Sequence, residues 1–317
     1  MRQGDRCLIT GGAGFIGANL AYELLQRGMR VRILDNFSTG RRENLEGIAD
    51  DIEIVEGDIR GIETVRHAVK DAPTIFHEAA LPSVSRSIAD PMTTHETNAT
   101  GTLNVMIAAR DAEAERIVFA SSSSIYGDAE RLPVDESMAP HPISPYAVSK
   151  LAGEGFLAAF HQAYGLATVA LRYFNVFGPR QDPGSEYAAV VPRFAVAALR
   201  GRPVTIFGDG EQLRDFTYIG DVVQANMLAA DAPPEARGRV FNIAGGDPRS
   251  VNDLLATIRE IVPSDPQEPV HEPHRVGDVR SSHADISAAK DALGYTPASG
   301  FAEGVRRTVE WLAGRES

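Results

Sequence analysis

The sequence predicts an α/β protein with a doubly wound parallel sheet and a smaller C-terminal lobe. In the first half of the chain, short apolar runs of strand length alternate with segments of helical periodicity. The first of these runs, Cys7–Thr10, leads directly into a glycine-rich loop and then into a helical segment, Ala18–Arg27. Strands that alternate with helices in this way are typical of a parallel sheet with right-handed crossovers.

Composition restricts the class of protein. The chain has 317 residues, of which 43% are apolar and 23% charged, and a net charge of −12. The acidic balance and the lack of a Lys/Arg-rich run argue against nucleic-acid binding. No apolar stretch of 18 residues and no leader segment is visible, so we predict a cytoplasmic protein that does not bind membranes. The single cysteine, Cys7, lies in an apolar run and is predicted to be a core residue, and we expect no metal site.

The glycine-rich loop follows the first predicted strand. Gly11, Gly14 and Gly17 are spaced three residues apart. Glycine at these positions allows a tight turn, lets backbone N–H groups approach a pyrophosphate, and lets the helix pack closely on the strand. Because a strand precedes the loop and a helical pattern follows it, the sequence predicts a Rossmann dinucleotide-binding fold.

The second predicted strand, Val31–Leu34, ends at Asp35. A carboxylate at this strand end can accept hydrogen bonds from the adenosine ribose and would repel a 2′-phosphate, so we predict NAD rather than NADP. Arg41 and Arg42 leave NADP open, because an arginine nearby could accommodate that phosphate. The alternative for Asp35 is a capping role.

Two further strands also end in residues that suit a cofactor. Ile52–Val55 leads to Asp58, which could accept a hydrogen bond from the adenine amino group. Thr74–His77 is followed by the small residues Ala79 and Ala80, which would leave room for the ribose and pyrophosphate.

The fifth predicted strand, Ile117–Ala120, follows a long helical segment, Thr94–Arg110, and ends in the serine run Ser121–Ser124. The carboxyl ends of strands are where open α/β sheets bind ligands. One of these hydroxyls could hydrogen-bond a reacting oxygen, and the alternative is a polar turn.

Ser144 and Pro145 are predicted to begin a helix in which Tyr146 and Lys150 share one face. A free tyrosine has a pKa near ~10, and a nearby positive charge favours the phenolate. Lowering this pKa by ~3 units requires about 4 kcal/mol, more than we expect from Lys150 alone. A bound cationic nicotinamide ring would add a second positive charge. The alternative is a surface helix in which the two side chains have no special role.

These motifs, together with others in the second half, carry a family resemblance. The chain resembles the extended short-chain dehydrogenases/reductases, and within them the UDP-glucose/UDP-N-acetylglucosamine 4-epimerases. The matching segments are Thr10–Gly17, Asp35–Asn36, Gly57–Asp58, Ser121–Gly127, Tyr146–Lys150, Leu171–Pro183, Arg214–Asp215 and Gly277–Arg280.

The resemblance implies a mechanism. Tyr146 as phenolate takes the proton of the sugar 4-hydroxyl while hydride passes from C4 to NAD+, and the 4-keto sugar then turns over and takes the hydride back on its other face. Lys150 is implied to bind the nicotinamide ribose and to lower the pKa of Tyr146. The catalytic hydroxyl maps to Ser122, with Ser121 and Ser123 left open. Two alternatives remain, a UDP-glucuronate 4-epimerase and a non-enzymatic NAD-binding sensor.

The resemblance also implies which residues contact each ligand. The implied NAD contacts are Gly11, Gly14, Phe15, Ile16, Gly17, Asp35, Asn36, Asp58, Ile59, Ala79, Ala80, Tyr146, Lys150 and Tyr173. The implied UDP-sugar contacts are Ser83, Ser122, Tyr146, Asn175, Val190, Thr205, Phe207, Arg214, Arg275, Asp278 and Ser282. Among the latter, Asn175 and the two arginines would hold the diphosphate, and the strand around Thr205 would cradle the uracil.

The implied organisation is a Rossmann domain at 1–175, with segments near 221–243 returning to it, and an interleaved UDP-sugar lobe at 176–317. Ser123 and Ser124 replace the acid pair that related dehydratases need, which argues against water elimination. Ser282 stands where some glucose-restricted epimerases carry a tyrosine, so we expect room for a 2-acetamido group. By analogy with the family we expect a homodimer through the helical segments Thr94–Arg110 and Tyr146–Tyr164.

Overall fold

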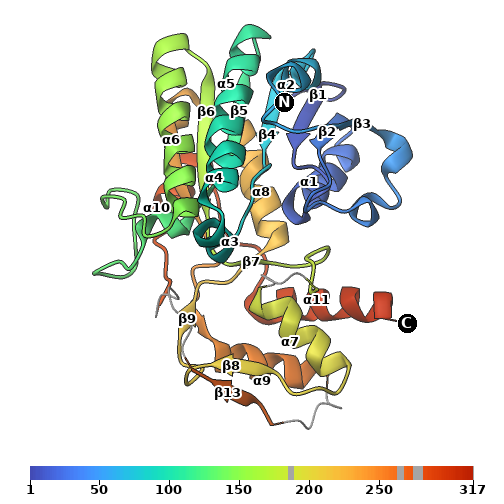
Figure 1. Cartoon of the computed structure of the whole chain (residues 1–317), viewed down its shortest axis with the longest axis vertical. Coiled ribbons are helices and arrows are strands. Elements are labelled where there is room, and N and C mark those ends of the chain that lie inside the picture. Colours follow the sequence, from blue (N-terminus) through green and yellow to red (C-terminus); the bar gives the residue numbers. More distant parts are fainter. Residues whose placement is uncertain (185–188, 263–267, 274–280, 317) are drawn as a thin grey trace.

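The computed structural model describes residues 1–184, 189–262, 268–273 and 281–316 (Figure 1). Seven parallel strands form one sheet in the order β11-β6-β5-β4-β1-β2-β3. This confirms the predicted fold class. The strands are β1 (Arg6–Thr10), β2 (Arg30–Asp35), β3 (Ile52–Glu56), β4 (Thr74–His77), β5 (Arg116–Ser122), β6 (Ala167–Tyr173) and β11 (Arg239–Ile243).

Helices cover both faces of the sheet because the central strands are apolar on both sides. In β1, Cys7 and Ile9 pack into one core layer and Leu8 into the other. The first layer contains α1 (Phe15–Gln26), α8 (Ile219–Ala230) and α10 (Ser287–Leu293). The second contains α2 (Ile62–Val69), α5 (Gly101–Asp111) and α6 (Pro145–Tyr164).

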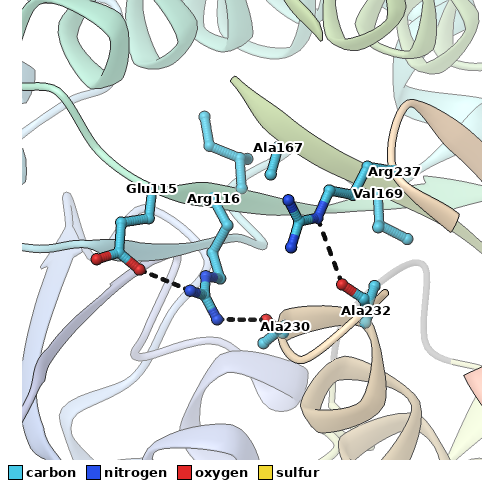
Figure 2. A pocket seen from close by; sticks show the side chains of 9 residues that line it. Glu115, Arg116, Ala167, Val169, Ala230, Ala232 and Arg237 are labelled. Carbon is cyan, nitrogen blue, oxygen red and sulfur yellow. Dashed lines mark hydrogen bonds and ion pairs between the residues drawn. The ribbon is translucent and has the colours of Figure 1, made fainter. Parts of the chain in front are cut away.

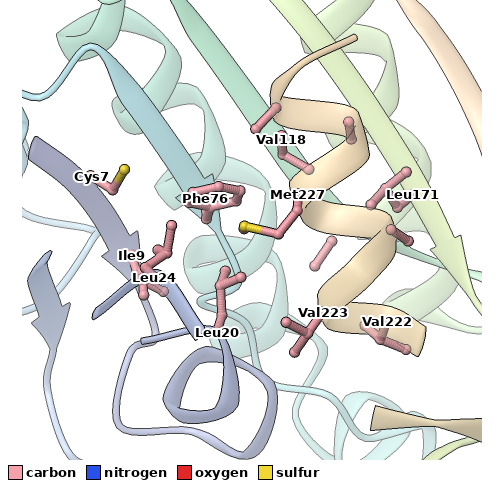
Figure 3. Packing of buried hydrophobic residues seen from close by; sticks show 14 of the residues in the cluster. Cys7, Ile9, Leu20, Leu24, Phe76, Val118, Leu171, Val222, Val223 and Met227 are labelled. Carbon is pink, nitrogen blue, oxygen red and sulfur yellow. The ribbon is translucent and has the colours of Figure 1, made fainter. Parts of the chain in front are cut away.

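The layer between the sheet and α8 is closely filled. Figure 3 shows Met227 and Val223 of α8 facing Phe76 and Val118 of the sheet. Cys7 lies in the same layer, is fully buried, and has a thiol pKa that burial raises to about 12. The thiol is therefore a core group, as the sequence predicted, and not a nucleophile.

The chain leaves the sheet after β6 and comes back to it. β11 pairs in parallel with β6, Phe241 lying opposite Leu171, and α8 precedes this strand. Residues 219–243 therefore belong to the sheet and its covering layer.

A smaller lobe lies below the carboxyl ends of the strands in Figure 1. Its core is formed by α7 (Val190–Leu199), α9 (Val251–Ile261) and α11 (Phe301–Glu316). Short strand pairs complete the lobe: β7 (Val176–Phe177) with β10 (Thr217–Tyr218), β8 (Thr205–Phe207) with β13 (Val270–Glu272), and β9 (Leu213–Arg214) with β12 (Arg249–Ser250).

The segment predicted as one helix over Thr94–Arg110 is interrupted. It begins earlier, as α4 (Pro91–His95), and passes through a π-helical turn, Glu96–Thr100, into α5. The short helix α3 (Val84–Ala89) precedes it, and 3-10 turns occur at Arg42–Leu45, Ala49–Asp51, Ser123–Tyr126 and Pro234–Ala236.

A hollow of about 270 Å³ lies at the amino-terminal edge of the sheet, away from the glycine loop (Figure 2). The guanidinium of Arg116 donates a hydrogen bond of 2.8 Å to the carbonyl of Ala230, in the last turn of α8. Arg237 donates to the carbonyl of Ala232 at 3.4 Å. Both arginines therefore satisfy carbonyl groups at and just beyond the end of α8, which gives them a structural role.

In the described ranges, no helix is long and apolar enough to cross a membrane. No group of three or more His, Cys, Asp or Glu side chains there could hold a metal ion.

Candidate active site

The largest feature at the carboxyl edge of the sheet is a cleft of about 720 Å³. Its walls include the glycine loop, the end of β2, the residues after β4, and the segment from Arg180 to Gly184. The cleft lies at the carboxyl ends of the strands, beside the point between β1 and β4 where the order of the strands reverses. This is where doubly wound sheets bind ligands.

The glycine loop has the geometry of a phosphate cradle. Gly11 has φ +70°, and a Cβ there would lie 2.7 Å from the backbone nitrogen of Ala79. A Cβ on Gly17 would lie 2.3 Å from the carbonyl oxygen of Gly11. Helix α1 begins at Phe15 without a side-chain cap, so the helix start keeps N–H groups for an anion. The loop therefore fits the pyrophosphate of a dinucleotide.

Asp35 lies at the end of β2, as predicted, and also holds the loop. Its carboxylate accepts hydrogen bonds from the backbone N–H groups of Ala13, at 2.9 Å, and Phe37, at 2.8 Å. Burial raises the pKa of Asp35. Each carboxylate oxygen keeps a second lone pair, so it can also accept a hydrogen bond from a ribose hydroxyl. The capping role that the sequence left open for Asp35 is therefore compatible with a contact to the ribose.

Asp58 lines the same end of the cleft. It accepts hydrogen bonds from Asn36, at 2.8 Å, and from Arg60, which hold its pKa down at about 2. The carboxylate is therefore ionised and fixed in place.

Arg41 and Arg42, the two arginines that could have bound a 2′-phosphate, each form an ion pair with an acidic side chain. Arg41 pairs with Asp182 at 2.6 Å, and Arg42 pairs with Glu56 at 2.5 Å. A 2′-phosphate would have to displace these carboxylates and approach Asp35, so the arrangement favours NAD.

Helix α6 forms as the sequence predicted. Ser144 is the N-cap and its hydroxyl accepts a hydrogen bond of 3.2 Å from the backbone N–H of Ala147, with Pro145 in the first turn. The ammonium of Lys150 lies 6.0 Å from the ring centre of Tyr146 and donates a 2.7 Å hydrogen bond to the carbonyl of Ala120. Lys150 is only 4% exposed, so the surface-helix alternative is wrong for it.

The four side chains of the serine run, Ser121–Ser124, point toward different parts of the protein. Ser122 is close enough to Tyr146 for its hydroxyl to lower the pKa of the phenol. Ser121 instead donates a 2.6 Å hydrogen bond to Glu154 in the buried layer. Ser123 and Ser124 face a second hollow. The side chain next to the phenol is therefore that of Ser122.

The protein alone does not make Tyr146 a base. Burial raises the pKa of Tyr146, and the hydroxyl of Ser122 opposes this only in part. Burial lowers the pKa of Lys150 to about 8, so its ammonium remains mostly charged near pH 7. This agrees with the expectation that a second positive charge is needed to form the phenolate.

The second hollow, of about 210 Å³, opens between the serine run and the smaller lobe. Asn175 contributes to it from a strained backbone with φ 34°, and its amide donates to the carbonyl of Asp215 at 3.3 Å and the hydroxyl of Ser282 at 3.4 Å. Arg214 lines the same hollow and is 8% exposed. An amide, a guanidinium and several hydroxyls suit a polar, anionic ligand.

Other predicted site residues are dispersed. Ser83 lines the cleft and caps α3, accepting a 3.0 Å hydrogen bond from the N–H of Arg86. Thr205 lines a separate hollow beside α7, of about 220 Å³, and Val190 is the first residue of that helix. Phe207 ends the same short strand as Thr205. Arg275 and Asp278 lie outside the described residues.

The remaining predicted cofactor residues lie along the cleft, apart from Tyr173. Phe15, Ile16, Ile59 and Ala80 line it. Tyr173 reaches it from β6 by donating a 3.1 Å hydrogen bond to the carboxylate of Glu78.

Two cleft residues were missed by the sequence reasoning. Glu78 lines the cleft and follows β4 directly. Its position at the end of a predicted strand was a signal that could have identified it. Arg180 has φ 72°, donates to Asn19 at 2.9 Å, and lies 3.8 Å over the ring of Tyr22. It joins the smaller lobe to α1, and no local pattern signals this contact.

Comparisons with known proteins agree with this arrangement. Residues 7–244 match the model of the NAD dependent epimerase/dehydratase family. The UDP-glucose 4-epimerase of Mycolicibacterium smegmatis is 40% identical over 311 residues, covering 97% of this chain and 98% of that protein. UDP-glucuronate 4-epimerases of Arabidopsis thaliana are also similar, at 31% to 33% identity.

Two solved structures share the whole fold. The UDP-glucose 4-epimerase of Thermotoga maritima with UDP-glucose has a TM-score of 0.94 and 38% identity, covering 98% of this chain and 100% of that one. The UDP-N-acetylglucosamine 4-epimerase of Methanobrevibacter ruminantium, in complex with UDP-N-acetylmuramic acid, has a TM-score of 0.94 and 38% identity, covering 99% and 100%.

Proposed function

The chain belongs to the NAD dependent epimerase/dehydratase family, and we propose that it interconverts the 4-epimers of UDP-hexoses, both UDP-N-acetylglucosamine/UDP-N-acetylgalactosamine and UDP-glucose/UDP-galactose. The observation that carries the proposal is the contact of Tyr146 with Ser122 beside buried Lys150. Ser123, next to Ser122 in the chain, and Ser144, two residues before Tyr146, line the second hollow. A sugar held there would therefore bring a hydroxyl close to the phenol.

The roles of the three side chains follow from their chemistry. Tyr146 would take the proton of the sugar 4-hydroxyl and return it to the same oxygen after the 4-keto sugar has turned over. Ser122 would hold the same oxygen by a hydrogen bond. Lys150 would fix the nicotinamide ribose and favour the phenolate by its charge. NAD, held along the cleft, would supply the hydride acceptor and donor for C4 of the sugar.

The residues along the cleft fit NAD. The glycine loop offers N–H groups to the pyrophosphate, while Asp35 and Asp58 offer fixed carboxylates at the adenosine end. We propose the predicted cofactor residues as the NAD contacts, because Gly11 and Gly17 leave no room for a Cβ where the backbone must approach phosphate.

The residues that line the second hollow suit a neutral sugar joined to an anionic diphosphate. Arg214 and Asn175 line the second hollow, and we propose that they bind phosphate oxygens there. Ser123, Ser124 and Ser282 supply only small neutral groups around the remaining space. This lining lacks the acid pair of a dehydratase and leaves volume for a 2-acetamido group.

Replacing Ser282 with tyrosine should reduce turnover of UDP-N-acetylglucosamine by at least about tenfold and spare UDP-glucose, because the added ring would occupy the acetamido space. The measurement is kcat/KM for each sugar from chromatographic separation of the 4-epimers, with UDP-glucuronate as a third arm. Ser282→Ala is the matched control and should retain both activities. Equal loss of both sugars in Ser282→Tyr would refute the assignment, and preferred conversion of UDP-glucuronate would favour the alternative epimerase.

We also propose the expected homodimer through the helical segments Thr94–Arg110 and Tyr146–Tyr164, to which the neighbouring α3 and the start of α4 add exposed apolar side chains. Ile88 and Met92 expose 63% and 66% of their area, and Val148 of α6 exposes 51%. Helices α3 and α4 both pack on α6, so these apolar groups belong to neighbouring elements. Sedimentation velocity should show a dimer that Met92→Glu weakens; a monomer at all concentrations would contradict the proposal. The cytoplasmic location stays a prediction.

A further inference from the structure

The proposed reaction leaves Glu78 without a task, although its side chain lies in the cleft that fits the cofactor. Oε1 accepts a 3.1 Å hydrogen bond from the hydroxyl of Tyr173. That hydroxyl in turn accepts a 2.8 Å hydrogen bond from the amide of Asn226 on α8. Contacts from β6 and α8 therefore hold the carboxyl group in one orientation.

The second oxygen of Glu78 is left over. Oε2 is shielded from solvent and has no hydrogen-bond partner among the described residues. A buried carboxylate oxygen without a partner is costly, since it has lost water and gained nothing in return. Because Glu78 lines the cleft, a group bound there could supply the missing partner.

The place of Glu78 along the cleft indicates which part of the dinucleotide it faces. Asp35 ends β2 at the adenosine side, and Glu78 follows β4, two strands further along the sheet. Lys150, proposed to hold the nicotinamide ribose, is close enough to act on the charge of Glu78. Glu78 therefore lies at the nicotinamide end.

We propose that Glu78 is a positioning residue that makes the cleft bind the oxidised cofactor, with its cationic ring, in preference to the reduced cofactor. A carboxylate beside that ring attracts the positive charge of NAD+ and gains nothing from neutral dihydronicotinamide. An epimerase that starts each cycle from NAD+ would benefit from this bias. The inference rests on cofactor binding and not on the sugar substrate, so failure of the epimerase assay would leave it testable.

The charge of Glu78 can change near neutral pH. Burial raises its pKa to about 7, opposed by the hydrogen bond from Tyr173 and by the charge of Lys150. The neighbouring His77 stays neutral, since burial lowers its pKa to about 3. Above its pKa the carboxylate attracts the cationic ring, and below it the attraction is lost. The preference for NAD+ should therefore weaken as the pH falls from 8 to 6.

The test is equilibrium dialysis of the purified protein against mixtures of NAD+ and NADH, with the bound ratio read after release. E78Q keeps the size and the contact with Tyr173 but removes the charge, and at pH 8 should lower the preference for NAD+ about tenfold. E63Q removes an exposed carboxylate from α2, outside the cleft, and should leave the ratio unchanged. Any pH slope that persists in E78Q belongs to Lys150.

An unchanged NAD+ to NADH ratio in E78Q, with both affinities lowered alike, would overturn the proposal and leave Glu78 a structural support for Tyr173. If E78Q fails to fold, the pH series on the unsubstituted protein remains a test that the proposal can fail. A ratio that stays flat from pH 6 to 8 would likewise overturn it.

Discussion

Tyr146→Phe should lower kcat for 4-epimerisation about 10³-fold, because the ring remains but the group that accepts and returns the proton is gone. Ser122 lies close enough to this phenol to oppose the rise of its pKa. Steady-state rates with UDP-glucose, beside NAD binding by calorimetry, measure the effect. Cofactor binding should be retained, which separates a chemical defect from a folding defect.

Ser122→Ala is the matched control, and should lower kcat less than Tyr146→Phe because the base itself is kept. The pH profile separates the roles further. Burial raises the pKa of Tyr146 in the protein alone, so we expect the positive charge of bound NAD+ to favour the phenolate. Ultraviolet difference spectra should show phenolate near neutral pH only with NAD+ bound. More than a tenth of the normal rate in Tyr146→Phe would contradict the assignment.

Glu154→Leu should destabilise the protein by about 3–5 kcal/mol, because it leaves the guanidinium of Arg172 buried without a counter-charge. The two side chains are 6% and 5% exposed and form hydrogen bonds of 2.9 Å and 2.8 Å. Glu154 also accepts a hydrogen bond from the hydroxyl of Ser121. The ion pair of Glu154 with Arg172 therefore supports the end of β5, which carries Ser122. Urea unfolding followed by circular dichroism measures the loss.

The double variant Glu154→Leu/Arg172→Met is the informative partner of this experiment. Removing both charges replaces the pair by apolar side chains, and should recover much of the lost stability. Arg172 also donates a 2.7 Å hydrogen bond to the hydroxyl of Tyr126, so recovery should be incomplete. A loss below about 1 kcal/mol in Glu154→Leu alone would show that the pair is not structurally important.

The sequence predicted the elements whose cause is local. The limits of β4 agree residue for residue, because Thr74–His77 is a short run that is buried along its whole length. The start of α6 was predictable because Ser144 and Pro145 are a cap and a first-turn residue that act on their own helix. The glycine loop was predictable for the same reason: its spacing reflects a single turn.

The parts that escaped prediction depend on contacts between distant segments. Four consecutive serines look alike in sequence, and only the packing of β5 against α6 directs Ser121 to Glu154 and Ser122 to Tyr146. Glu154 itself resembles an ordinary helix acid until β6 brings Arg172 against it. The π turn between α4 and α5 likewise leaves no pattern in the residues that form it.

The central claim is that the protein inverts C4 of a UDP-hexose through a transient 4-keto sugar at Tyr146, with NAD regenerated in each cycle. The most direct measurement is to incubate the purified protein in D₂O with UDP-glucose and, separately, UDP-N-acetylglucosamine, with no reductant, and to identify the products by chromatography and mass spectrometry. The account predicts the 4-epimers, no carbon-bound deuterium and no net NADH. Loss of water, uptake of deuterium on carbon, or no conversion by protein that binds NAD would contradict it.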